Sequence, residues 1–172
     1  MKSIFISYSE NDADEVLSVI SALTDEGYSV KYDEEMKGQA NLSSAEEEEI
    51  ENCGVLLAFI SESSMGSAKC RNQVNFAISR SKSILSVFLA GATDEDIADM
   101  TPYSKATVNR ADYSGEYGFI KAVLSNGLIE GTRMGASASI KEKSAPKAAA
   151  PKTSASDGFA ASMKSAKPYS TV

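Results

Sequence analysis

The sequence predicts an α/β protein with a doubly wound, five-stranded parallel sheet flanked by helices. Apolar runs of strand length alternate with amphipathic stretches over the first 130 residues, the pattern of parallel βαβ units with right-handed crossovers. The clearest strand is Val55–Ile60, an unbroken apolar run typical of a strand buried on both faces. From Ser67 the apolar period lengthens to that of a helix.

Five stretches have the length and the apolar or β-branched content of strands. They are residues 3–8, 28–32, 55–60, 83–89 and 106–109. Five helices are predicted. The first ends at Gly27, the second begins near Ser44, the third begins after Ser67, and the last two cover 94–100 and 116–126. Their predicted inward-facing residues are Val16, Leu17, Ile20, Leu23, Ala45, Ile50, Cys53, Cys70, Val74, Ala77, Ile78, Phe119, Ile120, Val123 and Leu124.

An acidic run at residues 46–49 opens the second predicted helix. Carboxylates suit the positive end of a helix dipole, so a solvated helix face explains this run better than a metal site does. We therefore expect these glutamates to point largely outward, and we predict no bound metal.

Charge and residue content exclude several classes of function. Residues 1–130 hold 10 Lys and Arg against 22 Asp and Glu, a net charge of −12, whereas residues 131–172 hold 7 against 2, a net charge of +5. The acidic body would repel phosphates, so nucleic-acid binding is not expected. With 2 cysteines and no histidine, the sequence lacks a thiolate–imidazole pair, a Ser–His triad and a His-ligated zinc site.

The sequence shows neither a signal peptide nor a membrane span. Its first residues enter a strand-like run directly, and no apolar segment approaches the ~20 residues that cross a bilayer. We expect a cytoplasmic protein without membrane contact.

Composition changes after Leu128. Residues 131–172 are rich in Ala, Ser and Lys and contain three of the four prolines. Such a segment buries too little apolar surface to offset the entropy cost of ordering. The predicted organisation is an α/β domain over 1–130 and a disordered basic tail over 131–172.

Polar residues at the predicted strand ends form a candidate site, because open α/β sheets bind ligands outside the carboxyl ends of their strands. The candidates are Ser7, Tyr8, Ser9, Asp33, Lys37, Ser61, Ser64, Cys70 and Gln73. Structural roles remain the alternatives. In these alternatives, Ser7 and Ser61 simply end their strands, and Tyr8 packs near Asp33 instead of stacking on a base. Cys70 would then be a small buried residue and Gln73 a surface glutamine.

Other doubly wound classes fit these strand ends poorly. A Rossmann domain needs a glycine-rich turn after its first strand, whereas residues 7–12 contain no glycine and two carboxylates. Those carboxylates also argue against the phosphate cradle of a flavodoxin. A receiver domain needs acidic residues and a lysine at strand ends where this sequence has Ser7, Ser61 and no clear lysine. A nucleoside deoxyribosyltransferase-like protein shares the α/β layout but needs a catalytic glutamate that this sequence does not have at the expected position.

The sequence instead resembles the TIR (Toll/interleukin-1 receptor) domain, in its bacterial type. IFISYS at residues 4–9, with Asp12 soon after, is similar to the first box of the family, and GYSVKYD at residues 27–33 is similar to its second strand. Lys37 and Gly38 fall in the following loop, which the family uses in TIR–TIR contacts. The resemblance covers roughly residues 1–126 and implies a flavodoxin-like TIR fold.

The third strand and its helix carry the rest of the resemblance. Residues 56–61, followed by Ser64, Ser67 and Cys70, are similar to the family pattern of serines, tryptophan–cysteine, two residues and glutamate. Lys69 stands where the aromatic residue is usual, and Gln73 stands where the glutamate is usual.

Many TIR domains cleave or cyclise NAD+ at the nicotinamide–ribose bond, and that glutamate is their catalytic residue. A carboxylate there stabilises the positive charge that builds on the ribose. Gln73 can hydrogen-bond the ribose but carries no charge, so the resemblance implies a loss of about 10²-fold or more in rate. The glutamates at 46–49 lie on another helix and Glu62 belongs to a loop, so none is an obvious substitute.

Two functions of different classes follow from the resemblance. The first is a signalling or immune module that self-associates, including as filaments, or binds other TIR proteins, through residues 33–41 and the helix near Gln73. Its crevice would hold NAD+ as a ligand, with no other cofactor. The second is an NAD+ glycohydrolase or cyclase of a defence pathway, either diverged or inactivated by a Glu-to-Gln change.

Overall fold

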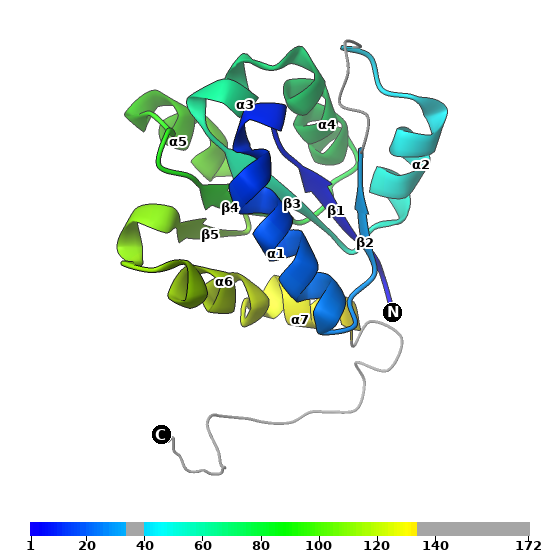
Figure 1. Ribbon diagram of the computed structural model, residues 1–172. Helices are drawn as coiled ribbons and strands as arrows, with labels where there is room; N and C mark the ends of the chain where they lie inside the picture. Colours follow the sequence, from blue (N-terminus) through cyan, green and yellow to red (C-terminus); the bar gives the residue numbers. More distant parts are fainter. Residues whose placement is uncertain (34–39, 134–172) are drawn as a thin grey trace. The chain divides into compact units, whose positions relative to one another are not determined.

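A parallel sheet of five strands, in the order β2-β1-β3-β4-β5, forms the centre of the fold (Figure 1). The computed structural model describes residues 1–33 and 40–133. Neighbouring strands all pair in parallel, so the predicted doubly wound sheet is confirmed. The strands are β1 (Ile4–Ser7), β2 (Val30–Tyr32), β3 (Val55–Ile60), β4 (Ile84–Phe88) and β5 (Ala106–Asn109).

Helices connect these strands and begin mostly at serine or threonine caps, whose side chains accept from backbone N–H groups that a helix leaves unpaired. The α-helices are α1 (Ala13–Asp25), α2 (Ser44–Asn52), α3 (Glu62–Gly66), α4 (Ala68–Ser79), α5 (Asp94–Met100), α6 (Glu116–Leu124) and α7 (Gly127–Arg133). The 3-10 turns are η1 (Glu10–Asp12), η2 (Thr101–Tyr103) and η3 (Arg110–Asp112). After α1, Gly27 adopts a φ of +90°, as expected of a helix-ending glycine.

The helices cover both faces of the sheet, and an apolar core lies on each face. α1, α6 and α7 pack on one face, where Val16 and Phe119 are fully buried. α2, α4 and α5 pack on the other face, around Ile50, Val74 and Met100. Because side chains alternate along a strand, β3 contributes to both cores, which explains its unbroken apolar sequence.

Several details differ from the sequence predictions. Leu17 is 44% exposed and Val19 takes its place in the core, because the buried stripe of α1 is centred one residue further round the helix. α3 and α7 were not predicted. α7 includes Gly131–Arg133, which were predicted to belong to the tail. In this segment the carbonyl oxygen of buried Thr132 accepts a hydrogen bond of 2.9 Å from the Lys2 N–H. Residues 134–172 lie outside the described residues.

None of the helices in the described ranges is both long enough and apolar enough to cross a membrane.

The strand order creates a switch point beside β1. β2 lies on one side of β1 and β3 on the other, so the connection after β1 runs in one direction along the sheet and the connection after β3 runs in the opposite direction. At such a point the loops that follow the two central strands diverge and leave a crevice at the carboxyl edge. Here the loop after β1 and the segment after β3, residues 61–67, lie at that edge and are joined by side-chain hydrogen bonds.

Candidate functional site

Side-chain hydrogen bonds join the loops that follow β1 and β3. Ser61 Oγ donates to Asp12 Oδ2 at 2.6 Å. Ser9 Oγ and Ser63 Oγ lie 2.7 Å apart, and Asn11 Nδ2 donates to Ser63 Oγ at 2.8 Å. The structure therefore brings predicted residues Ser9 and Ser61 to one edge. Asn11 and Ser63 were missed because each stands in a run of polar residues, and the spacing within such a run does not show which side chain points inward.

Ser61 and Ser64 also shape the loop themselves. Ser64 Oγ accepts from the Ser61 N–H at 2.9 Å, while Ser61 Oγ accepts from the Ser64 N–H at 3.0 Å. This reciprocal capping box starts α3. Ser61 is 3% exposed and Ser64 is 1% exposed, so both serve first to hold the segment after β3 in place.

Cys70 and Tyr8 are buried beneath these loops. The Cys70 thiol donates to the Tyr8 carbonyl oxygen, with a sulfur–oxygen distance of 3.2 Å. Burial raises the pKa of the Cys70 thiol despite hydrogen bonds from Ser67 and Ser7, so it stays protonated. Tyr8 is 6% exposed, and its ring centroid lies 6.4 Å from that of Tyr32, the residue before Asp33. The contacts of Cys70 and Tyr8 are therefore those of buried structural residues.

Four polar side chains form a continuous chain that starts at Asp33, directly after β2, and links α4 to α2. Gln73 Nε2 donates to Glu46 Oε1 at 3.1 Å. Lys69 Nζ lies 3.1 Å from Glu46 Oε2 and 3.1 Å from Asp33 Oδ2. The predicted candidates Asp33 and Gln73 are thus linked through two residues that were not predicted for the site. Lys37, the remaining candidate from this region, lies outside the described residues.

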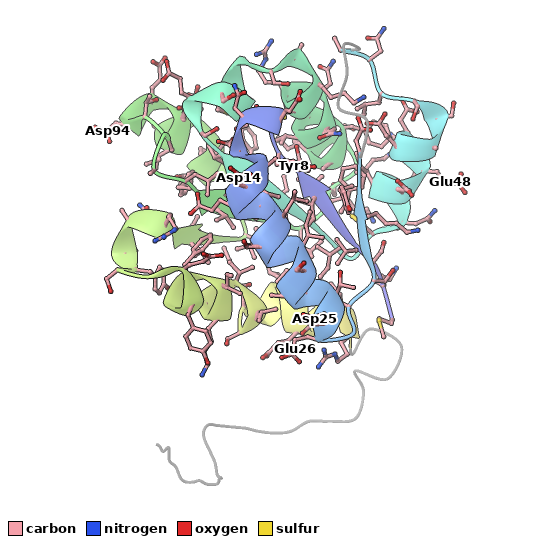
Figure 2. The ribbon with its side chains drawn as sticks, in the orientation of Figure 1. Tyr8, Asp14, Asp25, Glu26, Glu48 and Asp94 are labelled. Atoms are coloured by element: carbon pink, nitrogen blue, oxygen red, sulfur yellow. The ribbon has the colours of Figure 1, made fainter. Side chains whose placement is uncertain are left out.

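The prediction that Glu46 points outward is wrong. Glu46 is 9% exposed and Gln73, whose alternative was a surface role, is 2% exposed. Ala45, predicted inward, is exposed instead. Glu48 does project outward from α2 (Figure 2). The sequence held a signal for this: Ser43 stands three residues before Glu46, the capping-box spacing, and such a glutamate folds back towards the helix start.

Hydrogen bonds and ion pairs favour the charged forms of Glu46 and Lys69. Burial alone would raise the pKa of Glu46, but hydrogen bonds from Ser43, Gln73 and Lys69 outweigh it and lower that pKa. Burial alone would lower the pKa of Lys69, but Asp33 and Glu46 outweigh it and raise that pKa. Three donors converge on Glu46 Oε2: the Ser43 N–H at 3.1 Å, Ser43 Oγ at 3.0 Å and Lys69 Nζ.

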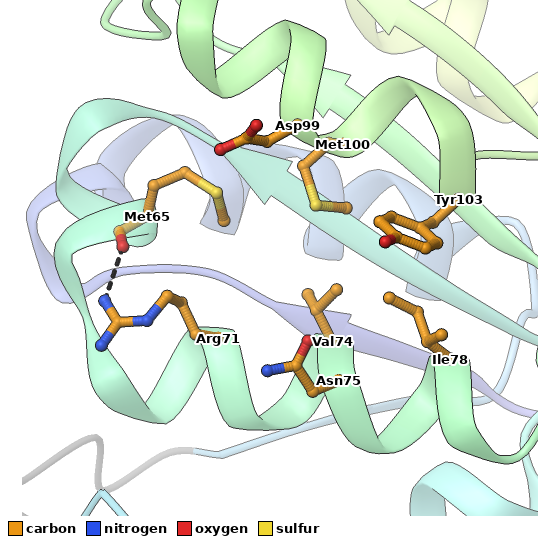
Figure 3. A pocket seen from close by; sticks show the side chains of 8 residues that line it. All are labelled: Met65, Arg71, Val74, Asn75, Ile78, Asp99, Met100 and Tyr103. Carbon is orange, nitrogen blue, oxygen red and sulfur yellow. Dashed lines mark hydrogen bonds between the residues drawn. The ribbon is translucent and has the colours of Figure 1, made fainter.

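A concave surface lies between α4 and α5 (Figure 3). Val74 and Ile78 of α4 face Met100 and Tyr103 across it, and Tyr103 is 54% exposed. At one end, Arg71 Nη1 donates to the Met65 carbonyl oxygen at 2.7 Å, which fixes the guanidinium at the rim. We call this surface the α4–α5 groove.

The parallel sheet in the order β2-β1-β3-β4-β5, with buried polar side chains at its switch point, defines a doubly wound α/β domain of the flavodoxin-like class. The sequence profile of the TIR domain family matches residues 4–123, and the chain belongs to this family. The match runs from β1 into α6, so it confirms the predicted resemblance. No curated protein sequence matches the chain.

Solved structures with similar folds include TIR domains and a glycosidase. The TIR domains of the activated Roq1 resistosome are 18% identical, with a TM-score of 0.49 over 76% of this chain and 74% of that one. The Clostridium botulinum CMP N-glycosidase BcmB is 14% identical, with a TM-score of 0.52 over 71% and 97%. A metazoan TIR-STING receptor from C. gigas is 17% identical, with a TM-score of 0.49 over 78% and 46%.

Proposed function

We propose that this chain is a signalling module that acts through TIR–TIR association, and that the crevice beside β1 binds NAD+ or a related nucleotide. The observation that carries the nucleotide proposal is the set of buried polar side chains at the switch point. Serine hydroxyls from both loops and the amide of Gln73 offer hydrogen bonds of the kind that ribose hydroxyls and phosphates accept or donate.

Two features of α4 support the association proposal. Asn72 Nδ2 of α4 donates to the Ala40 carbonyl oxygen at 2.7 Å, so α4 contacts the segment that follows residues 34–39. The α4–α5 groove lies on the same helix and exposes an aromatic ring among apolar side chains. Exposed apolar surface with a charged rim is typical of protein–protein interfaces.

Sedimentation velocity over a range of protein concentrations tests self-association. Charge reversal at Lys37, which lies outside the described residues, should weaken it if residues 33–41 take part. Sedimentation unchanged by Lys37→Glu would remove that loop from the proposal. Calorimetric titration with NAD+ tests the crevice separately: wild-type protein should bind, and Gln73→Ala should bind more weakly.

Cleavage of the nicotinamide–ribose bond, by hydrolysis or cyclisation, is a second candidate function. The observation that favours it is the Glu46 carboxylate beside Gln73, because cleavage of an N-glycosidic bond needs negative charge near the ribose. The shared fold of the CMP N-glycosidase shows architecture alone, so this proposal depends on the side chains. Release of nicotinamide from NAD+ by concentrated protein with a molecular crowder is the measurement that tests it.

A further inference from the structure

We propose that Glu46 supplies, from α2, the negative charge that the TIR resemblance expects at position 73. This inference rests on the proposed cleavage of NAD+ and names the residue that would stabilise its transition state. The side chain of Glu46 keeps 12% of its surface exposed. In this proposal the bound ribose contacts that exposed part.

Both departures from the family pattern contact this one carboxylate. Gln73 replaces the expected glutamate, and its Nε2 lies 3.1 Å from Glu46 Oε1. Lys69 replaces the expected aromatic residue, and its Nζ lies 3.1 Å from Glu46 Oε2. A single residue on the neighbouring helix therefore accounts for two substitutions that look unrelated in the sequence.

An uncharged amide at position 73 allows the carboxylate at position 46 to stay ionised. A glutamate at 73 would bring a second carboxylate within hydrogen-bond distance of Glu46, and two such groups cannot both stay ionised without a large electrostatic cost. Gln73 instead donates a hydrogen bond to Glu46. The pair then holds one negative charge, displaced by about one hydrogen-bond length from the position that the family uses.

Lys69 does not cancel this charge, because it is shared. Its ammonium group lies equally close to Asp33 and Glu46, at 3.1 Å from each. Asp33 therefore competes with Glu46 for this ammonium group, and the negative charge of Glu46 is only partly neutralised. Removal from water strengthens the interaction of that charge with a cationic transition state.

The assisted step is hydrolysis of the bond between ribose C1′ and the nicotinamide nitrogen. That bond breaks and its electron pair leaves with nicotinamide, which departs neutral while positive charge builds on the ribose. A water oxygen forms the new bond to C1′ and releases a proton to solvent, so NAD+ and water give nicotinamide, ADP-ribose and a proton. Glu46 stabilises the positive ribose as a fixed anion and does not need to take that proton.

Exchanging the two side chains tests the assignment. The variants are Glu46→Gln, the exchanged pair Glu46→Gln with Gln73→Glu, and Glu48→Gln as the matched control on the exposed side of α2. Each is assayed for nicotinamide release and for NAD+ binding by calorimetry, with circular dichroism to confirm folding. The exchanged pair keeps the net charge and both hydrogen-bonding groups, so it remains informative if Glu46→Gln fails to fold.

We expect Glu46→Gln to lower kcat by at least about 100-fold while the Kd for NAD+ changes only a few-fold. The exchanged pair should recover at least about tenfold of that loss, and Glu48→Gln should match the wild type. Full activity of Glu46→Gln would overturn the role of Glu46 but leave the glycosidase function. Turnover by the exchanged pair alone would also overturn it, since Glu46 would then be inert. Turnover by no protein would overturn the cleavage function itself, and this assignment with it.

Discussion

Glu46 accepts a hydrogen bond from Gln73 although the two side chains belong to different helices, α2 and α4, and both are buried. The same carboxylate caps its own helix through Ser43 and pairs with Lys69. One residue therefore couples the start of α2 to the first turns of α4. The packing of α2 against α4 and the stability of the domain depend on the same contacts.

Glu46→Gln should lower the free energy of unfolding by about 1–3 kcal/mol. The substitution removes a charged partner from Lys69 and weakens the capping box, and breaking buried hydrogen bonds to a charged group costs this order of magnitude. Glu48→Gln, on the exposed side of the same helix, should change it by less than about 0.5 kcal/mol. Urea unfolding followed by circular dichroism measures both values. Equal effects of the two variants would contradict the buried network.

The difference in stability between wild type and Glu46→Gln should depend on pH. The pKa of Glu46 is lowered on folding, so its contribution is present above about pH 4.3 and is lost as pH falls through the folded pKa. The pKa of Lys69 is raised, so its contribution is present below about pH 10.4 and is lost as pH rises through the folded pKa. The two melting temperatures should therefore differ most near neutral pH and converge in acid. A constant difference across that range would mean that packing, not charge, is responsible.

Local patterns predicted the fold well because each strand and most helices have a pattern of their own. The unbroken run Val55–Ile60 marks a strand buried on both faces, and it is found with those bounds. The site was harder to predict because its contacts join distant segments. The charge complementarity of Asp33, Lys69 and Glu46 exists only after β2, α4 and α2 pack together. The capping-box spacing from Ser43 was the one local sign that Glu46 turns inward.

Ser61→Ala should destabilise the domain by about 1–2 kcal/mol, the usual cost of losing a helix cap. It removes the acceptor for the Ser64 N–H and the donor to Asp12 Oδ2, which joins the loops after β1 and β3. We also expect weaker NAD+ binding, since the proposed crevice lies between those loops. Thermal melting and calorimetric titration measure the two effects. Ser18→Ala provides the control, because Ser18 is a half-buried serine of α1 whose hydroxyl donates to the Asp14 carbonyl oxygen within the same helix.

Tyr103→Glu should weaken self-association by at least about tenfold in Kd. Tyr103 is 54% exposed at the α4–α5 groove, and burial of an aromatic ring in an interface contributes more than the ~1.4 kcal/mol that corresponds to tenfold. A carboxylate there would remain in water rather than be buried against Val74 and Met100. Tyr117→Glu is the matched control, because Tyr117 is 77% exposed on α6, which packs on the opposite face of the sheet. Sedimentation velocity should show the loss for Tyr103→Glu alone. An equal loss for both variants would indicate a general charge effect, and no loss for either would exclude the groove from the interface.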